Sequence, residues 1–184
     1  MLLLDLGRQD YDKEIMPFLR NGIIIDTSII FKIIQGHILT RVTKKKSEEM
    51  PDYKNILDFF DLIKIQNRWE KFFITPHILT EVCRHFRETY DKWNNYRELV
   101  LEIMPILENM KEEVVIKDDF MKKIDHKNPV IEAGDISIYV TAENFSSKNR
   151  KVALLADDSG ITDRYINHPQ VLVLNYQSVI LNSL

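Results

Sequence analysis

The sequence has little of several features that define other classes of protein. Its 184 residues include one cysteine, Cys83, so no intramolecular disulfide can form, which fits a reducing compartment. Five glycines and six prolines are too few for a disordered or fibrous chain. No apolar run is long enough to span a bilayer, and Leu4 is followed by Asp5, so no signal peptide is expected. These absences predict a soluble, cytoplasmic protein with no membrane segment.

The chain also lacks a strong net charge. A formal charge of −3 and a pI near 6.0 do not suggest a general nucleic-acid coat, although they leave room for a local basic rim. With 45% hydrophobic residues, the chain is long enough for one well-packed domain and short for two. We therefore expect a single domain over residues 1–184, with a leader segment at 1–20 that packs on the sheet edge and a core at 21–176.

Short apolar runs are the clearest local signal. Residues 23–25 are three isoleucines after Gly22, without polar residues at helical spacing, which is typical of a strand buried on both faces of a parallel sheet. Similar runs predict strands at 71–75, 152–156 and 171–174, with a possible short strand at 114–116. Strands that alternate with helices at this spacing predict an α/β fold, a three-layer α/β/α sandwich around a mostly parallel sheet.

Helical spacing predicts the segments between these strands. A helix that runs to about Arg41 is expected to start either at Thr27 and Ser28 or at Ile29. Further helices are expected from Pro51, from Pro76 with Thr75 as N-cap, and from about residue 132. Residues 87–130 are expected to form a helical insertion. Within it, 93–110 makes a hairpin with the preceding helix, Pro105 bends that segment, and Asp118 or Asp119 caps a short helix through Ile124. A short tail at 179–181 is expected to pack on the core.

Acidic residues recur where the predicted strands end or the predicted helices begin. Asp26 follows the first strand, Asp157 and Asp158 follow the strand that ends at 156, and Glu81 and Asp135 lie early in helices. The carboxyl ends of parallel strands meet at one edge of a sheet, where ligands bind. Two like charges about 4 Å apart cost about 4 kcal/mol at an effective dielectric of about 20, and a divalent cation reverses that repulsion. Carboxylate and water ligands suit Mg²⁺ or Mn²⁺, and no His/Cys spacing favours zinc.

Each acidic residue also has a purely structural explanation. Asp26 can cap the helix that follows it, and Asp135 fits the preference of acidic groups for helix N-termini. Glu81 can form an ion pair with Arg84, three residues further along the same helix. Metal binding and these local roles are therefore both open for these positions.

Four short motifs, in this order, resemble those of the PIN domain nucleases. They lie at residues 23–28 (IIIDTS), 75–81 (TPHILTE), 134–138 (GDISI) and 154–161 (LLADDSGI). The resemblance implies a metal-dependent ribonuclease that acts on single-stranded RNA, with Asp26, Glu81, Asp135 and the last aspartate as its acidic site. The family usually has Thr-x-Asp in the last motif, which aligns Asp158 with the acid and Ala156 with the threonine.

These observations predict an enzyme that hydrolyses phosphodiester bonds. One or two divalent ions held by the carboxylates would activate a water that attacks in line and leaves a 3′-hydroxyl and a 5′-phosphate. Asp157 is a further ligand or an N-cap of the next helix, and Thr27 and Ser28 support the site. A positive rim for RNA phosphates would come from Arg84, Arg87 and the charge runs at 44–46 and 148–151, which include Lys148 and Arg150. The run at 44–46 is equally typical of a solvated loop.

Other functions stay open at this point. A non-catalytic PIN-fold module that binds RNA or protein is the main alternative, and Ala156 and the small net charge favour it. A phosphotransferase of the haloacid dehalogenase type would need an aspartate two residues after Asp26, where Ser28 stands. The toxin of a toxin–antitoxin pair, with an antitoxin partner, and a homodimer are compatible with the sequence.

Overall fold

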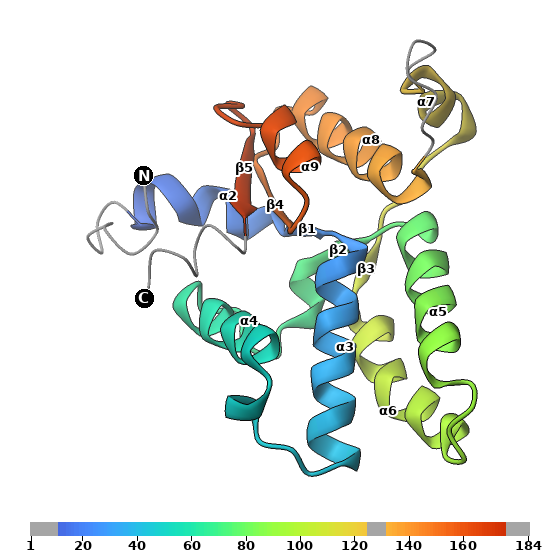
Figure 1. The fold of residues 1–184 in the computed structure, drawn as a ribbon. Helices are drawn as coiled ribbons and strands as arrows, with labels where there is room; N and C mark the ends of the chain where they lie inside the picture. Colours follow the sequence, from blue (N-terminus) through green and yellow to red (C-terminus); the bar gives the residue numbers. More distant parts are fainter. Residues whose placement is uncertain (1–10, 125–131, 176–184) are drawn as a thin grey trace.

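A computed structural model of the chain describes residues 11–124 and 132–175. They form an α/β fold around a five-stranded sheet whose paired strands are all parallel (Figure 1). The strand order is β3-β2-β1-β4-β5. The strands are β1 (Ile23–Ile25), β2 (Phe72–Ile74), β3 (Lys111–Glu112), β4 (Val152–Ala156) and β5 (Val171–Asn175).

The strand order reverses direction between β1 and β4. The chain runs outward from β1 to β2 and β3, returns to the other side of β1 as β4, and continues to β5. Ile25 pairs with Leu155, and the Asp26 N–H donates to the Leu155 carbonyl at 3.0 Å. Asp26 and Asp157 therefore leave neighbouring strands at the same edge, at the topological switch point where ligands bind in sheets of this kind.

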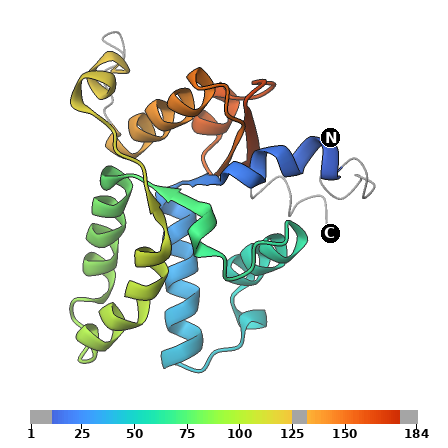
Figure 2. The same ribbon diagram turned by 180° about the vertical axis from the view of Figure 1, so that it is seen from behind.

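Helices lie on both faces of the sheet, an arrangement compatible with a three-layer sandwich. Figures 1 and 2 show α3 (Thr27–Val42), α4 (Pro51–Leu62), α5 (Pro76–Tyr90) and α6 (Tyr96–Asn109) on one side. On the other side lie α8 (Ala133–Ser147) and α9 (Ser159–Arg164). Of the predicted leader, the described part forms η2 (Tyr11–Ile15) and α2 (Met16–Asn21), and α2 contacts β4. Short segments η3 (Ser47–Glu49), η4 (Trp69–Lys71) and α7 (Lys117–Lys122) complete the described elements.

The apolar runs form the core, as the sequence predicts. All residues of β1, β2 and β4 are buried, and the three isoleucines of β1 have no exposed surface. Burial on both faces is what a central parallel strand requires. At the start of α5, Thr75 is the N-cap and accepts a hydrogen bond from the Ile78 N–H at 3.2 Å, with Pro76 next to it, as predicted. The predicted hairpin is confirmed, since α5 and α6 lie side by side and Phe86 contacts Tyr96.

Two expected boundaries are wrong, and a third is resolved. Of the two starts left open for the helix after Asp26, the structure has Thr27 and not Ile29. The possible strand at 114–116 is not a strand; β3 forms instead at Lys111–Glu112, where both side chains are exposed and only backbone pairing with β2 defines the element. Such an edge strand has no apolar pattern for a sequence to show. The N-cap position of α7 is Ile116, so neither Asp118 nor Asp119 caps that helix.

Two further expectations concern other parts of the chain. The tail at 179–181 and residues 1–10 of the leader lie outside the described residues. Among the helices that the structure describes, none has both the length and the apolar composition needed to cross a membrane.

Candidate active site

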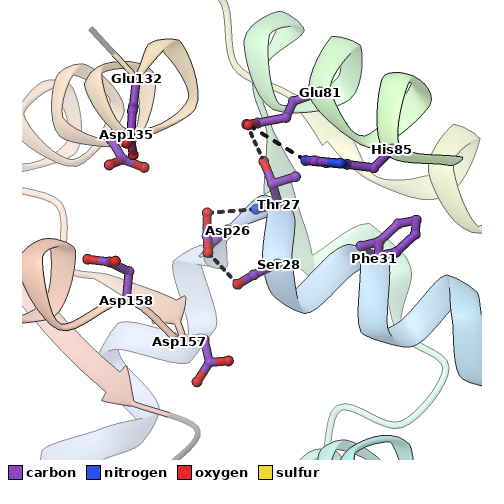
Figure 3. A pocket seen from close by; sticks show the side chains of 10 residues that line it. All are labelled: Asp26, Thr27, Ser28, Phe31, Glu81, His85, Glu132, Asp135, Asp157 and Asp158. Carbon is purple, nitrogen blue, oxygen red and sulfur yellow. Dashed lines mark hydrogen bonds and ion pairs between the residues drawn. The ribbon is translucent and has the colours of Figure 1, made fainter. Parts of the chain in front are cut away.

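The loop after β1 places Asp26 at the N-terminus of α3. Its Oδ1 accepts a hydrogen bond from the Thr27 N–H at 2.7 Å, and its Oδ2 accepts one from the Ser28 hydroxyl at 2.5 Å (Figure 3). The capping role is therefore confirmed. The residue is only 7% exposed, so its carboxylate is held in a fixed orientation at the end of β1. Capping does not exclude a second role, because the same carboxylate lines a pocket.

Glu81 reaches the same pocket from α5. Its Oε2 accepts a hydrogen bond from the Thr27 hydroxyl at 2.9 Å, which joins the first turn of α3 to α5 (Figure 3). The expected ion pair with Arg84 is present at 3.6 Å, and His85 lies 3.9 Å from the same carboxylate. Both pairs are long and partly exposed, so they stabilise the fold little. Thr27 thus has the supporting contact that the sequence suggested.

The N-terminus of α8 brings Asp135 to the pocket. Small residues fix this helix end against α5: the hydroxyls of Thr75 and Ser137 are 2.7 Å apart, and the Ser137 hydroxyl donates to the Gly134 carbonyl at 2.6 Å. A Cβ on Gly134 would lie 2.6 Å from Oε2 of Glu81. Glycine at this position is what allows the first turn of α8 to approach the Glu81 carboxylate.

The two aspartates after β4 have different partners. Asp158 is the N-cap of α9, and its Oδ1 accepts a hydrogen bond from the Ile161 N–H at 3.0 Å. Asp157 forms an ion pair with Lys32 of α3, and its Oδ1 is buried with no hydrogen-bond partner among the residues described. Figure 3 shows Asp158 on the same side of the pocket as Asp135, and Asp157 pointing away from that side. The expectation that Asp157 caps α9 is wrong, because the residue directly before the helix is Asp158.

These side chains line one pocket of about 400 Å³. All of the predicted acidic residues line it: Asp26, Glu81, Asp135, Asp157 and Asp158, together with Thr27 and Ser28. The pocket lies at the carboxyl ends of β1 and β4, the predicted edge of the sheet. Chain segments that are more than 100 residues apart therefore meet in one acidic site.

Acidic side chains outnumber basic ones in the lining of the pocket. Burial raises the pKa of Asp135 to about 7, with further contributions from a hydrogen bond to Glu132 and from the charges of Glu132, Asp26 and Asp158. Burial also raises the pKa of Asp26; the hydrogen bonds from Ser28 and Thr27 oppose this effect, and the charge of Glu81 adds to it. A site with such pKa shifts favours a proton or a cation.

The chemical type of the oxygen ligands in this pocket suits a hard divalent cation. Carboxylate oxygens supplied from α3, α5, α8 and the β4–α9 loop are the ligands that Mg²⁺ and Mn²⁺ prefer. Their spacing is wider than a single ion requires, since no three His, Cys, Asp or Glu side chains in 11–124 and 132–175 lie in a group that could hold one metal ion. The residues thus match the predicted metal in chemistry, and they would have to move closer together to bind it.

Of the predicted nucleic-acid contacts, Arg84 lies near this pocket, through its ion pair with Glu81, whereas Lys148 and Arg150 do not. Lys148 follows the C-terminus of α8, a 15-residue helix whose first turn carries Asp135. At 1.5 Å per residue, the 13 residues from Asp135 to Lys148 span about 20 Å along the helix axis. Arg150 stacks on Phe145 at 4.6 Å, at the same far end of α8. The charge run at 44–46 follows the C-terminus of α3, a further 16-residue helix that starts at the pocket. The structure therefore does not bring these cations together around the acids.

Three pocket residues were not among the predicted site residues. His85 lies four residues after Glu81 on the same helix side, and Glu132 lies three residues before Asp135, so helical spacing from the predicted acids is a signal that finds both. Phe31 lines the pocket from α3 and contacts His85, with ring centroids 5.8 Å apart. Its apolar spacing marks it as a core residue, so the sequence gives no sign of its place at the pocket.

Comparisons of the chain with models of known protein families and with curated proteins find no match. The fold and the acidic pocket together define an α/β protein with a parallel sheet and a carboxylate site at its topological switch point.

Proposed function

We propose that this protein is a metal-dependent endoribonuclease of the PIN domain kind, which hydrolyses phosphodiester bonds of single-stranded RNA. The observation that carries the proposal is the acidic pocket at the switch point, where burial, the neighbouring Glu132 and the charges of Asp26 and Asp158 raise the pKa of Asp135. Groups with strongly perturbed pKa values in a cleft are typical of functional sites. The parallel strand order and the four motifs that resemble the PIN family support the same assignment.

The carboxylates explain the need for a metal. Asp26, Glu81, Asp135 and Asp158 would hold Mg²⁺ or Mn²⁺, which supplies a water of lowered pKa and positive charge for the scissile phosphate. Without a cation, the acidic pocket would repel the RNA backbone. We assign Asp158 as the fourth acid and Asp157 as a neighbour of the site; the ion pair between Asp157 and Lys32 supports this choice.

The remaining residues orient these acids. The Ser28 hydroxyl and the Thr27 N–H fix both oxygens of Asp26, and the Thr27 hydroxyl fixes Glu81. Ligands that are held by such outer hydrogen bonds bind a metal with less loss of side-chain freedom. Arg84 lies at the edge of the site, half exposed, where it can contact a phosphate of the substrate.

Replacing Asp26 by Asn tests this function. The amide keeps the shape and an N-cap acceptor, so the fold survives, while a charge at the metal site is lost. We expect the rate of cleavage of a single-stranded RNA in Mn²⁺ to fall at least about tenfold. Loss of a group that only supports a metal ligand already has an effect of about this size. Asn should also leave the metal-free protein as stable as the parent or slightly more stable, because a buried charge is removed.

The controls make the result specific. Lys148→Gln removes a charge at the far end of α8 and should leave cleavage of a short RNA unchanged. Products should carry a 5′-phosphate and a 3′-hydroxyl, and EDTA should stop the reaction. Cleavage that persists in EDTA, or that is unaffected by Asp26→Asn, would contradict the proposal.

A non-catalytic module of the same fold is the second candidate. The spacing of the carboxylates, wider than one ion requires, and Ala156 in place of the family threonine favour it. Calorimetric titration with Mn²⁺ separates the two, since a folded protein that gives no response at millimolar Mn²⁺ would be the binding module. A toxin role is a narrower proposal, which a small open reading frame directly upstream of the gene would support.

A further inference from the structure

A second cavity, of about 550 Å³, lies beside the acidic pocket, between the N-terminal halves of α5 and α8. We call it the side pocket. It is lined by His77, Thr80, Arg84 and Ala133, and it shares Glu81 and Glu132 with the acidic pocket. Figure 3 shows Glu81 on α5 and Glu132 at the N-terminal end of α8. A ligand that reacts in the acidic pocket would therefore have its neighbouring group at the mouth of the side pocket.

The walls of the side pocket combine apolar surface with a few polar groups. Pro76, Ala133 and Gly134 supply small apolar walls. The His77 ring is held by parallel stacking on Phe120, with centroids 4.9 Å apart and planes 15° apart. Its Nδ1 is buried and has no hydrogen-bond partner in the part of the chain that the structure describes. A flat group with hydrogen-bonding edges suits such a cavity.

The charged side chains at the border of the side pocket indicate which flat group it could bind. The Glu132 carboxylate at the border accepts hydrogen bonds, as carboxylates do from the amino group of cytosine. The Arg84 guanidinium, 54% exposed, offers a plane for stacking. A base with an exocyclic amino group satisfies both, whereas the single ring N–H of uracil lies between two carbonyl oxygens and gives the carboxylate a weaker contact.

We propose that the side pocket binds the base of the nucleotide next to the scissile phosphate and prefers bases that carry an amino group over uracil. The choice of RNA as the ligand rests on the proposed nuclease function. The cavity itself does not, since apart from Glu81 and Glu132 none of its lining residues lines the acidic pocket.

Binding of free cytidine and uridine to the intact protein tests the proposal without any cleavage. These nucleosides are neutral, so the acidic pocket does not repel them. They differ at C4, which carries an amino group in cytidine and a carbonyl in uridine, and at N3, which is an acceptor in cytidine and an N–H in uridine. In an NMR titration we expect cytidine to bind about fivefold more tightly or better, as one good carboxylate–amino contact gives, and to shift the amide signals of Thr80 and Ala133. Equal binding of both nucleosides, or shifts elsewhere, would overturn the proposal.

Variants of exposed residues locate the site. Thr80→Trp fills the side pocket and should lower cytidine affinity about tenfold, while Thr80→Ala leaves the pocket open and should keep it. Arg84→Ala should weaken binding, and Arg87→Ala, which removes a cation of the same helix outside the pocket, should not. If both members of either pair behave alike, the side pocket is not the base site.

The outcomes also separate this proposal from the nuclease function. The protein could bind nucleosides in the predicted pattern and yet cleave no RNA with Mn²⁺. That result would support the base-binding site and contradict the proposed nuclease function. Conversely, Thr80→Trp could cleave RNA that has cytosine next to the scissile phosphate with Mn²⁺ and with an unchanged KM. That result would support the nuclease function and contradict the base-binding site.

Discussion

At the scale of single residues, Asp157 and Asp158 show how adjacent carboxylates acquire different roles. Residues that leave a strand one after the other point in different directions. Asp158 lies on the same side of the pocket as Asp135, where its charge adds to the effect of burial in raising the pKa of Asp135, whereas Asp157 pairs with Lys32 of α3. The sequence places both aspartates at the edge of the sheet. It does not give their partners, since these come from segments far away in the chain.

This difference predicts the behaviour of four variants. Asp158→Asn should abolish Mn²⁺-dependent cleavage at nearly unchanged stability, since Asn is as good an N-cap as Asp. Asp158→Ala should in addition lower the free energy of unfolding by about 1 kcal/mol, because the cap on α9 is lost. Asp157→Asn should keep a substantial part of the activity, as should Lys32→Gln. Kinetics on one RNA and thermal melting of the purified variants check this; a higher activity for Asp158→Asn than for Asp157→Asn would reverse the assignment.

At the scale of elements, a helix or strand can be predicted from the sequence only when its own residues carry the signal for it. The strands β1 and β4 and the start of α5 are apparent in the sequence, because buried runs and the Thr75–Pro76 pair are local signals. β3 is not, since Lys111 and Glu112 are exposed and only their pairing with β2 makes them a strand. The acidic site follows the same rule. The sequence predicts that each acid lies at the end of a helix or strand, but it does not predict the distances between the acids, because contacts between distant segments set them.

The contact between α5 and α8 gives a prediction for Gly134. In Gly134→Ala the new Cβ would lie 2.6 Å from Oε2 of Glu81, which is the end of a flexible side chain and can move. Alanine also favours a helix over glycine by about 1 kcal/mol, so the melting temperature should change little. The displaced Glu81 should lose its hydrogen bond from Thr27, and Mn²⁺ affinity measured by calorimetry should fall.

A second glycine provides the matched control. The Cβ of Gly36→Ala would lie 2.0 Å from the Tyr53 ring, far from the acidic pocket. This variant should melt at a lower temperature and bind Mn²⁺ with unchanged affinity. If Gly134→Ala instead loses stability and keeps its Mn²⁺ affinity, Glu81 is not part of the metal site.

At the scale of the whole molecule, the charges are separated between the two ends of α8. The acids gather at the carboxyl edge of the sheet, while Lys148 and Arg150 lie beyond the other end of the helix. Composition cannot reveal this separation, because it gives only the near-neutral sum. A cation bound at the acidic edge is therefore expected to increase the stability of the folded protein as well as to support catalysis.

Divalent ions should accordingly stabilise the protein. A ligand that binds only the native state contributes about 2.7 kcal/mol at one hundred times its dissociation constant. For a chain of this length, that corresponds to a rise of about 5 to 10 °C in Tm. Differential scanning fluorimetry in EDTA and in saturating Mn²⁺ measures it, with Asp26→Asn as the control that should respond less. A parent protein whose Tm does not change in Mn²⁺ would count against the metal site.

The metal-free protein should lose stability as its acidic pocket ionises. The folded-state pKa of Asp135 is raised from 3.8 to about 7, so between these values the native state binds more protons than the unfolded state. The free energy of unfolding therefore falls as pH rises through this window, and Asp26, whose pKa is also raised, acts in the same direction.

Asp135→Asn isolates this effect from the titration of all other groups. The amide cannot ionise, so the Tm of the variant minus that of the parent should be near zero below about pH 4, grow as pH rises, and level off above about pH 8 in EDTA. Asp163→Asn, on the exposed side of α9, should show no such growth. Saturating Mn²⁺ should cancel or reverse the difference, because the cation then compensates the charge that only the parent carries. A difference that is constant with pH would mean that Asp135 is ionised normally and that the pocket is not an electrostatic unit.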